Sequence, residues 1–143
     1  MPADRISRWL RPAVADMTAY NVADASGMVK LDAMENPYGL PLELRAAWAD
    51  RLQQMSVNRY PDPAATDLKF ALREKLDLPA ESGLILGNGS DEIIQMLAIA
   101  LGGEGRAMMS LEPAFVMYRL IAHMNGLRYI SMNLGQDDFS IDL

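Results

Sequence analysis

The chain has 143 residues, of which half are hydrophobic and 22% are charged, a composition that suits a globular protein with a buried core. It has no cysteine and one histidine, which excludes disulfides, thiolate zinc sites, a thiol nucleophile and histidine-rich metal sites. The net charge of −6 argues against a nucleic-acid partner. Because no apolar run could span a bilayer or serve as a secretory signal, we expect a cytoplasmic protein with no membrane contact.

The N-terminal region has little periodicity, so we expect residues 1–30 to form an arm that packs on another part of the structure. At the end of this arm, the apolar stretch Met-Val-Lys-Leu at 28–31 follows Gly27 and predicts a short strand. The next segment, Asp-Ala-Met-Glu-Asn-Pro-Tyr-Gly at 32–39, is rich in turn-forming residues and predicts a loop.

Two amphipathic helices are predicted in the next part of the chain. The first follows Pro41, a residue type favoured in the first turn of a helix. Its apolar side chains recur at helical spacing: Leu44, Trp48, Leu52 and Met55. The segment Asn-Arg-Tyr-Pro-Asp-Pro at 58–63 then interrupts the helical pattern, because it contains two prolines. The second helix starts near Thr66 or Asp67 and has a stripe of leucines: Leu68, Leu72 and Leu76.

From residue 84 the sequence alternates between strand and helix patterns. Strands are predicted at 84–86, 107–110 and 127–132, and helices at 93–101 and 116–124. The first of these helices is apolar on all sides, which predicts that it is buried on all sides. Strand, helix, strand, helix and strand in this order indicate an α/β fold with a parallel sheet and right-handed crossovers.

Residues 87–91, Gly-Asn-Gly-Ser-Asp, lie between a predicted strand and a predicted helix. Glycines allow close approach of a ligand to the backbone, and a helix N-terminus attracts phosphate. The spacing differs from the mononucleotide and dinucleotide glycine motifs. A tight turn with Ser90 as helix cap explains the segment equally well. Because Asp91 and Glu92 would repel a phosphate, a phosphate site here would use backbone groups and Ser90.

Four segments in this order resemble the histidinol-phosphate aminotransferases, a family of pyridoxal-phosphate enzymes of fold type I. The segments are residues 31–39, 58–63, 87–92 and 113–118. The resemblance covers nearly all of this chain, but only the N-terminal portion of a family member. It implies an N-terminal arm at 1–30, part of the small domain with linking helices at 31–83, and the start of the large cofactor-binding α/β domain at 84–143.

The resemblance also implies a role for particular residues in binding pyridoxal 5'-phosphate. Gly89, Ser90 and Asp91 would hold the phosphate of the cofactor at the start of a helix. Phe115 would stack on the pyridine ring of the cofactor. The hydroxyl of Tyr60 would reach the cofactor phosphate of the neighbouring subunit, which makes the protein a homodimer.

On the substrate side, the resemblance places Tyr20 near the substrate and Asn36 in the segment that lines the substrate pocket. Met34 departs from the pattern, because the family commonly has asparagine at this position. Each aromatic residue also has a simpler interpretation: Phe115 as an ordinary core residue, and Tyr60 and Tyr20 as residues that pack a loop or lie on the surface.

The three lysines are Lys30, Lys69 and Lys75, and none follows a later strand of the sheet, where the family has its Schiff-base lysine. We therefore expect no catalytic residue in these 143 residues, which alone would be inactive. The expected activity of the whole protein is transamination of histidinol phosphate with 2-oxoglutarate in histidine biosynthesis. The alternatives are another fold-type I aminotransferase, a phospho-amino-acid decarboxylase, or a non-catalytic domain for phosphate binding or assembly.

Overall fold

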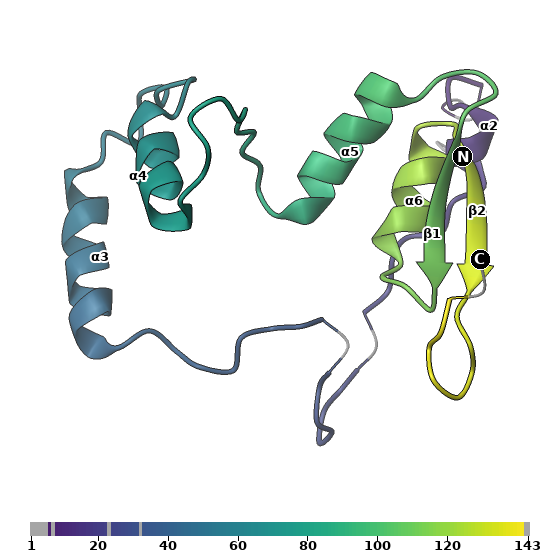
Figure 1. Ribbon diagram of the computed structural model, residues 1–143, viewed down its shortest axis with the longest axis horizontal. Helices are drawn as coiled ribbons and strands as arrows, with labels where there is room; N and C mark the ends of the chain where they lie inside the picture. The colour runs from purple at the N-terminus through teal and green to yellow at the C-terminus, as the bar shows by residue number, and fades with distance from the viewer. Residues whose placement is uncertain (1–5, 7, 23, 32, 142–143) are drawn as a thin grey trace. The chain divides into compact units, whose positions relative to one another are not determined.

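The computed structural model describes residue 6 and residues 8–22, 24–31 and 33–141. The chain forms two compact units: residues 1–20 with 84–143, and residues 21–83 (Figure 1). Residues 1–5, 7, 23, 32 and 142–143 lie outside the described part. They belong to the predicted arm, to the 31–39 segment and to the predicted large domain. The division of the chain into an arm, a small domain and a large domain stays a prediction.

The first unit is built on two parallel strands, β1 (Ala107–Glu112) and β2 (Arg128–Asn133). Their register pairs Ala107 with Arg128 and continues to Glu112 with Asn133. Helix α6 (Met117–Met124) connects the two strands and lies beside both of them (Figure 1), as the crossover between parallel strands requires. The predicted α/β fold and its last three elements are therefore confirmed.

The core of this unit lies where α5 (Ser90–Leu101), α6 and β2 meet. Four apolar side chains are buried there: Ala98, Ile121, Ala122 and Leu127. Partly buried side chains surround them: Ile94, Met108, Met117, Met124 and Tyr129. The short helix α2 (Pro12–Ala15) also contacts α6. Next to it, the guanidinium of Arg11 donates a hydrogen bond to the carbonyl of Met124, which attaches the N-terminal segment to this unit.

Two predicted strands are wrong. Residues 28–31 and 84–86 form no strand, and neither segment pairs with another strand within the described part of the chain. In the second segment, burial alternates along the chain, with Ile85 exposed between two half-buried leucines. A strand requires a ladder of hydrogen bonds to a partner, and an apolar run contains no information about whether that partner is present.

The prediction that α5 is buried on all sides is also wrong. Ala98 is its only buried residue among those described, and Leu97, Ile99 and Leu101 are exposed. One side of α5 contacts α6, and the side chains of Leu97, Ile99 and Leu101 lie outside the buried cluster. An apolar side chain is buried only where a neighbouring element packs against it, so the sequence predicted the helix correctly but not its surroundings.

The second unit contains the two predicted amphipathic helices, α3 (Leu42–Gln54) and α4 (Thr66–Leu76). Both are confirmed in position, with Pro41 directly before α3. Neither helix has a buried residue. Most of their apolar side chains are exposed, and Leu72 on α4 is half-buried. In the described ranges of both units, no helix combines the length and apolarity needed to cross a membrane.

Candidate functional site

The loop before α5 has the backbone geometry that the phosphate hypothesis requires. Gly89 is the N-cap of α5, with φ 85° and ψ 171°, a conformation that is essentially restricted to glycine. A Cβ built on Gly89 would meet no heavy atom within 4 Å, so the space beside this backbone is open. A ligand could therefore approach the main chain closely at Gly89.

Ser90 is the first residue of α5 and not its cap, so that detail of the tight-turn interpretation is wrong. Within the described part of the chain, no side chain caps the start of α5, which leaves the N–H groups of its first turn available to an anion. The carboxylate of Glu92 folds back over the loop, where its Oε2 accepts a hydrogen bond from the Asn88 N–H at 2.5 Å. Because this carboxylate would repel an anion, a phosphate ester could be held here only through the backbone N–H groups of Gly89, Ser90 and Asp91 and through the Ser90 hydroxyl.

Phe115 lies three residues after the end of β1, in the turn that leads into α6. The carboxyl ends of parallel strands form the edge where α/β proteins bind ligands, so Phe115 lies at the expected edge of the sheet. Its side chain is 43% exposed and is not part of the buried cluster. An exposed aromatic at this edge fits a ring-stacking role better than a core role.

The structure adds a polar cluster at the end of β1 that the sequence analysis missed. The carboxylate of Glu112 accepts hydrogen bonds from Arg119 Nη2 at 2.9 Å and from the Tyr129 hydroxyl at 2.7 Å, both at Oε1. Its Oε2 accepts a third, from the Ala114 N–H at 3.0 Å. The Arg119 guanidinium also lies 5.1 Å from the centre of the Tyr129 ring, within range of a cation–π contact.

The ionisation of this cluster follows from its contacts. The hydrogen bond from Tyr129, and next the one from Arg119, lower the pKa of Glu112 below its ordinary value. The Glu112 carboxylate raises the pKa of Arg119, and partial burial, followed by the hydrogen bond to Glu112, raises the pKa of Tyr129. At neutral pH the cluster is a carboxylate, a guanidinium and a neutral phenol. Arg119 and Tyr129 lie 7 and 17 residues from Glu112, so no local pattern could reveal it.

The other predicted site residues are distributed over both units. Tyr20 is exposed in the same unit as the Gly89 loop and Phe115, whereas Tyr60 and Asn36 belong to the second unit. Tyr60 is fully exposed and, with residues 57–59, lines a shallow hollow of about 320 Å³. Asn36 Oδ1 accepts a hydrogen bond from the Tyr38 N–H at 3.0 Å, which fixes a local turn. Gly89, Ser90 and Asp91 are consecutive residues at the start of α5. The roles of all the predicted site residues stay predictions.

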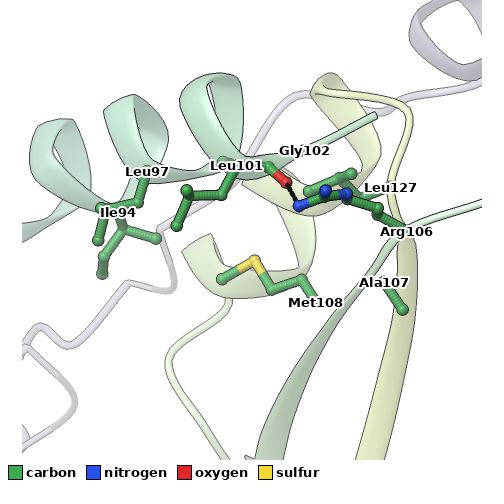
Figure 2. Close-up of a pocket in the computed structure, with 9 residues that line it drawn as sticks. Ile94, Leu97, Leu101, Gly102, Arg106, Ala107, Met108 and Leu127 are labelled. Carbon is green, nitrogen blue, oxygen red and sulfur yellow. Dashed lines mark hydrogen bonds between the residues drawn. The ribbon is translucent and has the colours of Figure 1, made fainter. Parts of the chain in front are cut away.

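A larger hollow of about 660 Å³ lies beside α5 and contains none of the predicted site residues. Figure 2 shows its aliphatic lining, to which Ile94, Leu97 and Met108 contribute. Arg106 also lines the hollow, but its Nη1 donates a hydrogen bond to the Leu101 carbonyl at 2.7 Å and so satisfies the C-terminal end of α5. Small-molecule sites combine an apolar lining with several convergent polar groups, and this hollow lacks them.

All three lysines of the chain belong to the second unit. Lys30 Nζ forms an ion pair with Glu35 Oε2 at 3.2 Å, and Lys69 and Lys75 lie on α4. None of them is in the unit that contains the Gly89 loop and Phe115. The expectation that these 143 residues contain no catalytic lysine stays a prediction.

The parallel strands with a crossover helix place this unit in the class of α/β proteins, in which ligands bind beyond the carboxyl ends of the strands. The comparison with known families is more specific. The family model for class I and II aminotransferases matches residues 26–143. The chain therefore belongs to the class I and II aminotransferase family.

Individual relatives give the same result. The chain is 51% identical over 140 residues to a histidinol-phosphate aminotransferase of Thiocapsa roseopersicina, covering 98% of this chain and 74% of that protein. It is 54% identical over 143 residues to histidinol-phosphate aminotransferase 2 of Nitrosococcus oceani, covering 100% of this chain but 39% of that protein.

A solved structure from Burkholderia pseudomallei, provisionally assigned as an aminotransferase, is also similar to this chain. It matches with a TM-score of 0.63 and 28% identity, over 78% of this chain and 33% of that one. The chain thus spans well under half of the length of this protein and of the Nitrosococcus relative. That coverage agrees with the prediction that the chain corresponds to a portion of a family member.

Proposed function

We propose that the full-length protein containing these residues transfers an amino group between histidinol phosphate and 2-oxoglutarate, in histidine biosynthesis, with pyridoxal phosphate as cofactor. The observation that supports this most is the identity of 51% and 54% to two relatives that are named histidinol-phosphate aminotransferases. The family model supports the broader class of reaction. Nitrogen transfer between two carbon skeletons is chemistry that the cofactor supplies when it is bound.

In this proposal the chain itself contributes the binding of the cofactor. The N–H groups at the start of α5, together with Ser90 Oγ, bind the dianionic phosphate, because the helix terminus attracts negative charge. The glycine conformation at Gly89 lets the phosphate approach the backbone. The ring of Phe115 covers one face of the cofactor ring, which orients the cofactor and excludes water from that face.

Three further residues complete the proposed site. The Tyr60 hydroxyl donates a hydrogen bond to the cofactor phosphate of the neighbouring subunit, so the active protein is a homodimer. Tyr20 and Asn36 contact the substrate. Exposure of Tyr60 and Tyr20 supports these assignments, because a residue that reaches a ligand or a second subunit cannot be buried in its own unit. A cytoplasmic location completes the proposal.

The proposal is tested with the full-length protein, reconstituted with pyridoxal phosphate and supplied with histidinol phosphate and 2-oxoglutarate. We expect stoichiometric formation of glutamate, measured by mass spectrometry. An aromatic amino acid in place of histidinol phosphate tests for a different aminotransferase. Release of carbon dioxide from a phospho-amino acid tests for a decarboxylase. Cofactor binding without turnover of any of these substrates would contradict the proposed activity and favour a non-catalytic role.

A further inference from the structure

The three hydrogen bonds to Glu112 connect three different elements of the first unit. Glu112 ends β1, Arg119 lies on α6 and Tyr129 lies on β2. The third donor, the Ala114 N–H, belongs to the turn between β1 and α6. A carboxylate accepts hydrogen bonds only, through two oxygens, and here every partner is a donor. The side chain of Glu112 is 21% exposed, so water competes only in part for these contacts.

The bond to Ala114 matters most, because Ala114 directly precedes Phe115. Past the last pair of the ladder, Glu112 with Asn133, the backbone of this turn has no strand to hold it. The Glu112 carboxylate replaces that support by accepting the Ala114 N–H, while Arg119 and Tyr129 hold the carboxylate itself. The Phe115 carbonyl accepts a hydrogen bond from the Tyr118 N–H of α6 at 3.3 Å. On the side of the turn that faces the sheet, the residue before Phe115 is held by the Glu112 side chain.

We propose that Glu112 is a positioning residue, whose carboxylate fixes the turn at 113–115 and thereby holds the Phe115 ring in place against the cofactor ring. This inference rests on the proposed function, because the proposed function identifies the cofactor as pyridoxal phosphate. The alternative is a purely structural role of Glu112. In that case its hydrogen bonds attach α6 to the sheet, and the turn at 113–115 forms equally well without the Glu112 carboxylate.

The substitution Glu112→Gln separates the two roles with little change in volume. The amide oxygen of glutamine accepts hydrogen bonds, but its NH₂ group donates. Both carboxylate oxygens of Glu112 accept hydrogen bonds. In the glutamine variant, an NH₂ group replaces one of these oxygens and faces a hydrogen-bond donor. The matched control is Glu104→Gln, the same change at an exposed residue in the turn before β1. Tyr129→Phe is a milder variant that removes a single donor to Glu112 and keeps the ring.

The first measurement is hydrogen exchange in the full-length protein without cofactor. We expect exchange of the Ala114 amide to become at least about ten-fold faster in Glu112→Gln, the loss that follows from breaking a charge-assisted hydrogen bond. Amides of β1 should be unchanged, and Glu104→Gln should resemble the wild type. Tyr129→Phe should shift Ala114 in the same direction by a smaller factor. Unchanged Ala114 exchange in Glu112→Gln would overturn the proposal.

The second measurement is a double-mutant cycle with Phe115→Leu, in which pyridoxal phosphate is titrated into each full-length variant and followed by its induced circular dichroism. We expect Glu112→Gln to weaken cofactor affinity about ten-fold in the wild-type background. With leucine at position 115, the same change should have less than about a two-fold effect, because the two residues act as one unit.

The outcomes of this cycle are distinct. An effect of Glu112→Gln that persists fully in the Phe115→Leu background would overturn the positioning role and leave the proposed function intact. A wild-type protein that binds no pyridoxal phosphate would overturn the proposed function and, with it, the cofactor part of this inference. The exchange measurement would then still decide whether Glu112 fixes the turn. If Glu112→Gln fails to fold, Tyr129→Phe takes its place in both measurements, with smaller expected changes.

Discussion

The two units of the chain differ in what holds them together. The unit that contains the parallel strands buries a cluster in which Ile121 is 1% exposed. The unit of residues 21–83 has two well-formed helices but no buried residue in either. Both units have clear amphipathic patterns in the sequence. The difference shows that periodicity determines where a helix forms, whereas burial requires neighbouring elements that the pattern does not specify.

A similar contrast separates the two predicted aromatic contacts to the cofactor. Phe115 lies in a turn that Glu112 holds through donors from distant elements. Near Tyr60, Asp62 accepts hydrogen bonds only from close neighbours in sequence, the N–H groups of Ala64 and Thr66 at 3.0 and 2.8 Å. Local bonds of this kind fix the start of α4. They do not hold the Tyr60 side chain, which stays fully exposed.

The largest expected effect tests the contrast in burial. Ile121→Ala in the 143-residue chain should destabilise it by about 2–5 kcal/mol, because it leaves a cavity in the only buried cluster of the described residues. Leu52→Ala on α3 should cost about 1 kcal/mol or less, because that side chain is 49% exposed. Urea unfolding followed by circular dichroism measures both. Similar losses would mean that α3 packs against a core after all.

The next effect concerns the backbone at the start of α5. Gly89→Ala should cost about 1–3 kcal/mol, because alanine is disfavoured at φ 85° and ψ 171°, and should also weaken binding of pyridoxal phosphate to the full-length protein. Gly83→Ala is the matched control: it has an open Cβ position and a φ outside the left-handed region. Cofactor titration beside a denaturant melt separates the two effects. Lost stability with unchanged cofactor affinity would contradict the phosphate site.

A third prediction compares how the turns held by the Glu112 and Asp62 carboxylates respond to a decrease in pH. Hydrogen bonds lower the folded-state pKa of Glu112 from 4.5 and that of Asp62 from 3.8, with the Tyr129 hydroxyl and the Thr66 N–H as their respective main causes. A lowered folded pKa gives stability that is fully present above the ordinary value and is lost as the pH falls through the folded value. Protection of the Ala114 and Ala64 amides should therefore persist to below pH 4.5 and 3.8, respectively.

Two-dimensional NMR of the carboxyl groups and amides measures both titrations. Protection in each turn should disappear together with the titration of its own carboxylate. If Ala114 loses protection near pH 4.5 or above, Glu112 does not hold the turn in its charged form, and the contrast between long-range and local support disappears.

The smallest effect on stability is expected at Tyr60. Tyr60→Phe should change the free energy of unfolding by no more than about 0.5 kcal/mol, because the side chain is fully exposed. Its hydroxyl donates no hydrogen bond among the described residues. In the full-length dimer the same change should weaken cofactor retention, measured by spectroscopic titration after dialysis, if the hydroxyl reaches the partner's cofactor.

Dimers formed from two different variant subunits test the role of Tyr60 more specifically. A subunit with Tyr60→Phe has an intact lysine, and a partner with an inactivated lysine has an intact Tyr60. One site of the mixed dimer should then combine an intact lysine with an intact Tyr60 and retain the cofactor normally, although neither parent has a normal site. Subunit exchange without recovery, or unchanged cofactor affinity of Tyr60→Phe, would leave Tyr60 as a loop residue only.

Much of this protein was predictable from its sequence for physical reasons that act locally. Helical spacing and Pro41 predicted α3, the leucine stripe predicted α4, and apolar runs predicted β1 and β2. Four motifs in register predicted the aminotransferase family, which the family model and the relatives confirm. The glycines at 87–91 indicated a special turn, and the structure shows why Gly89 is required there.

Only the tertiary structure decided which segments pair, which faces are buried and which polar groups meet. The apolar run at 84–86 resembles a strand, but without a partner it forms no ladder. The apolar helix α5 is buried at Ala98 alone, because α6 covers only one of its sides. Glu112, Arg119 and Tyr129 converge because the crossover through α6 makes β1 and β2 neighbours. These contacts join residues far apart in the sequence, so they depend on the folded topology and leave no local pattern.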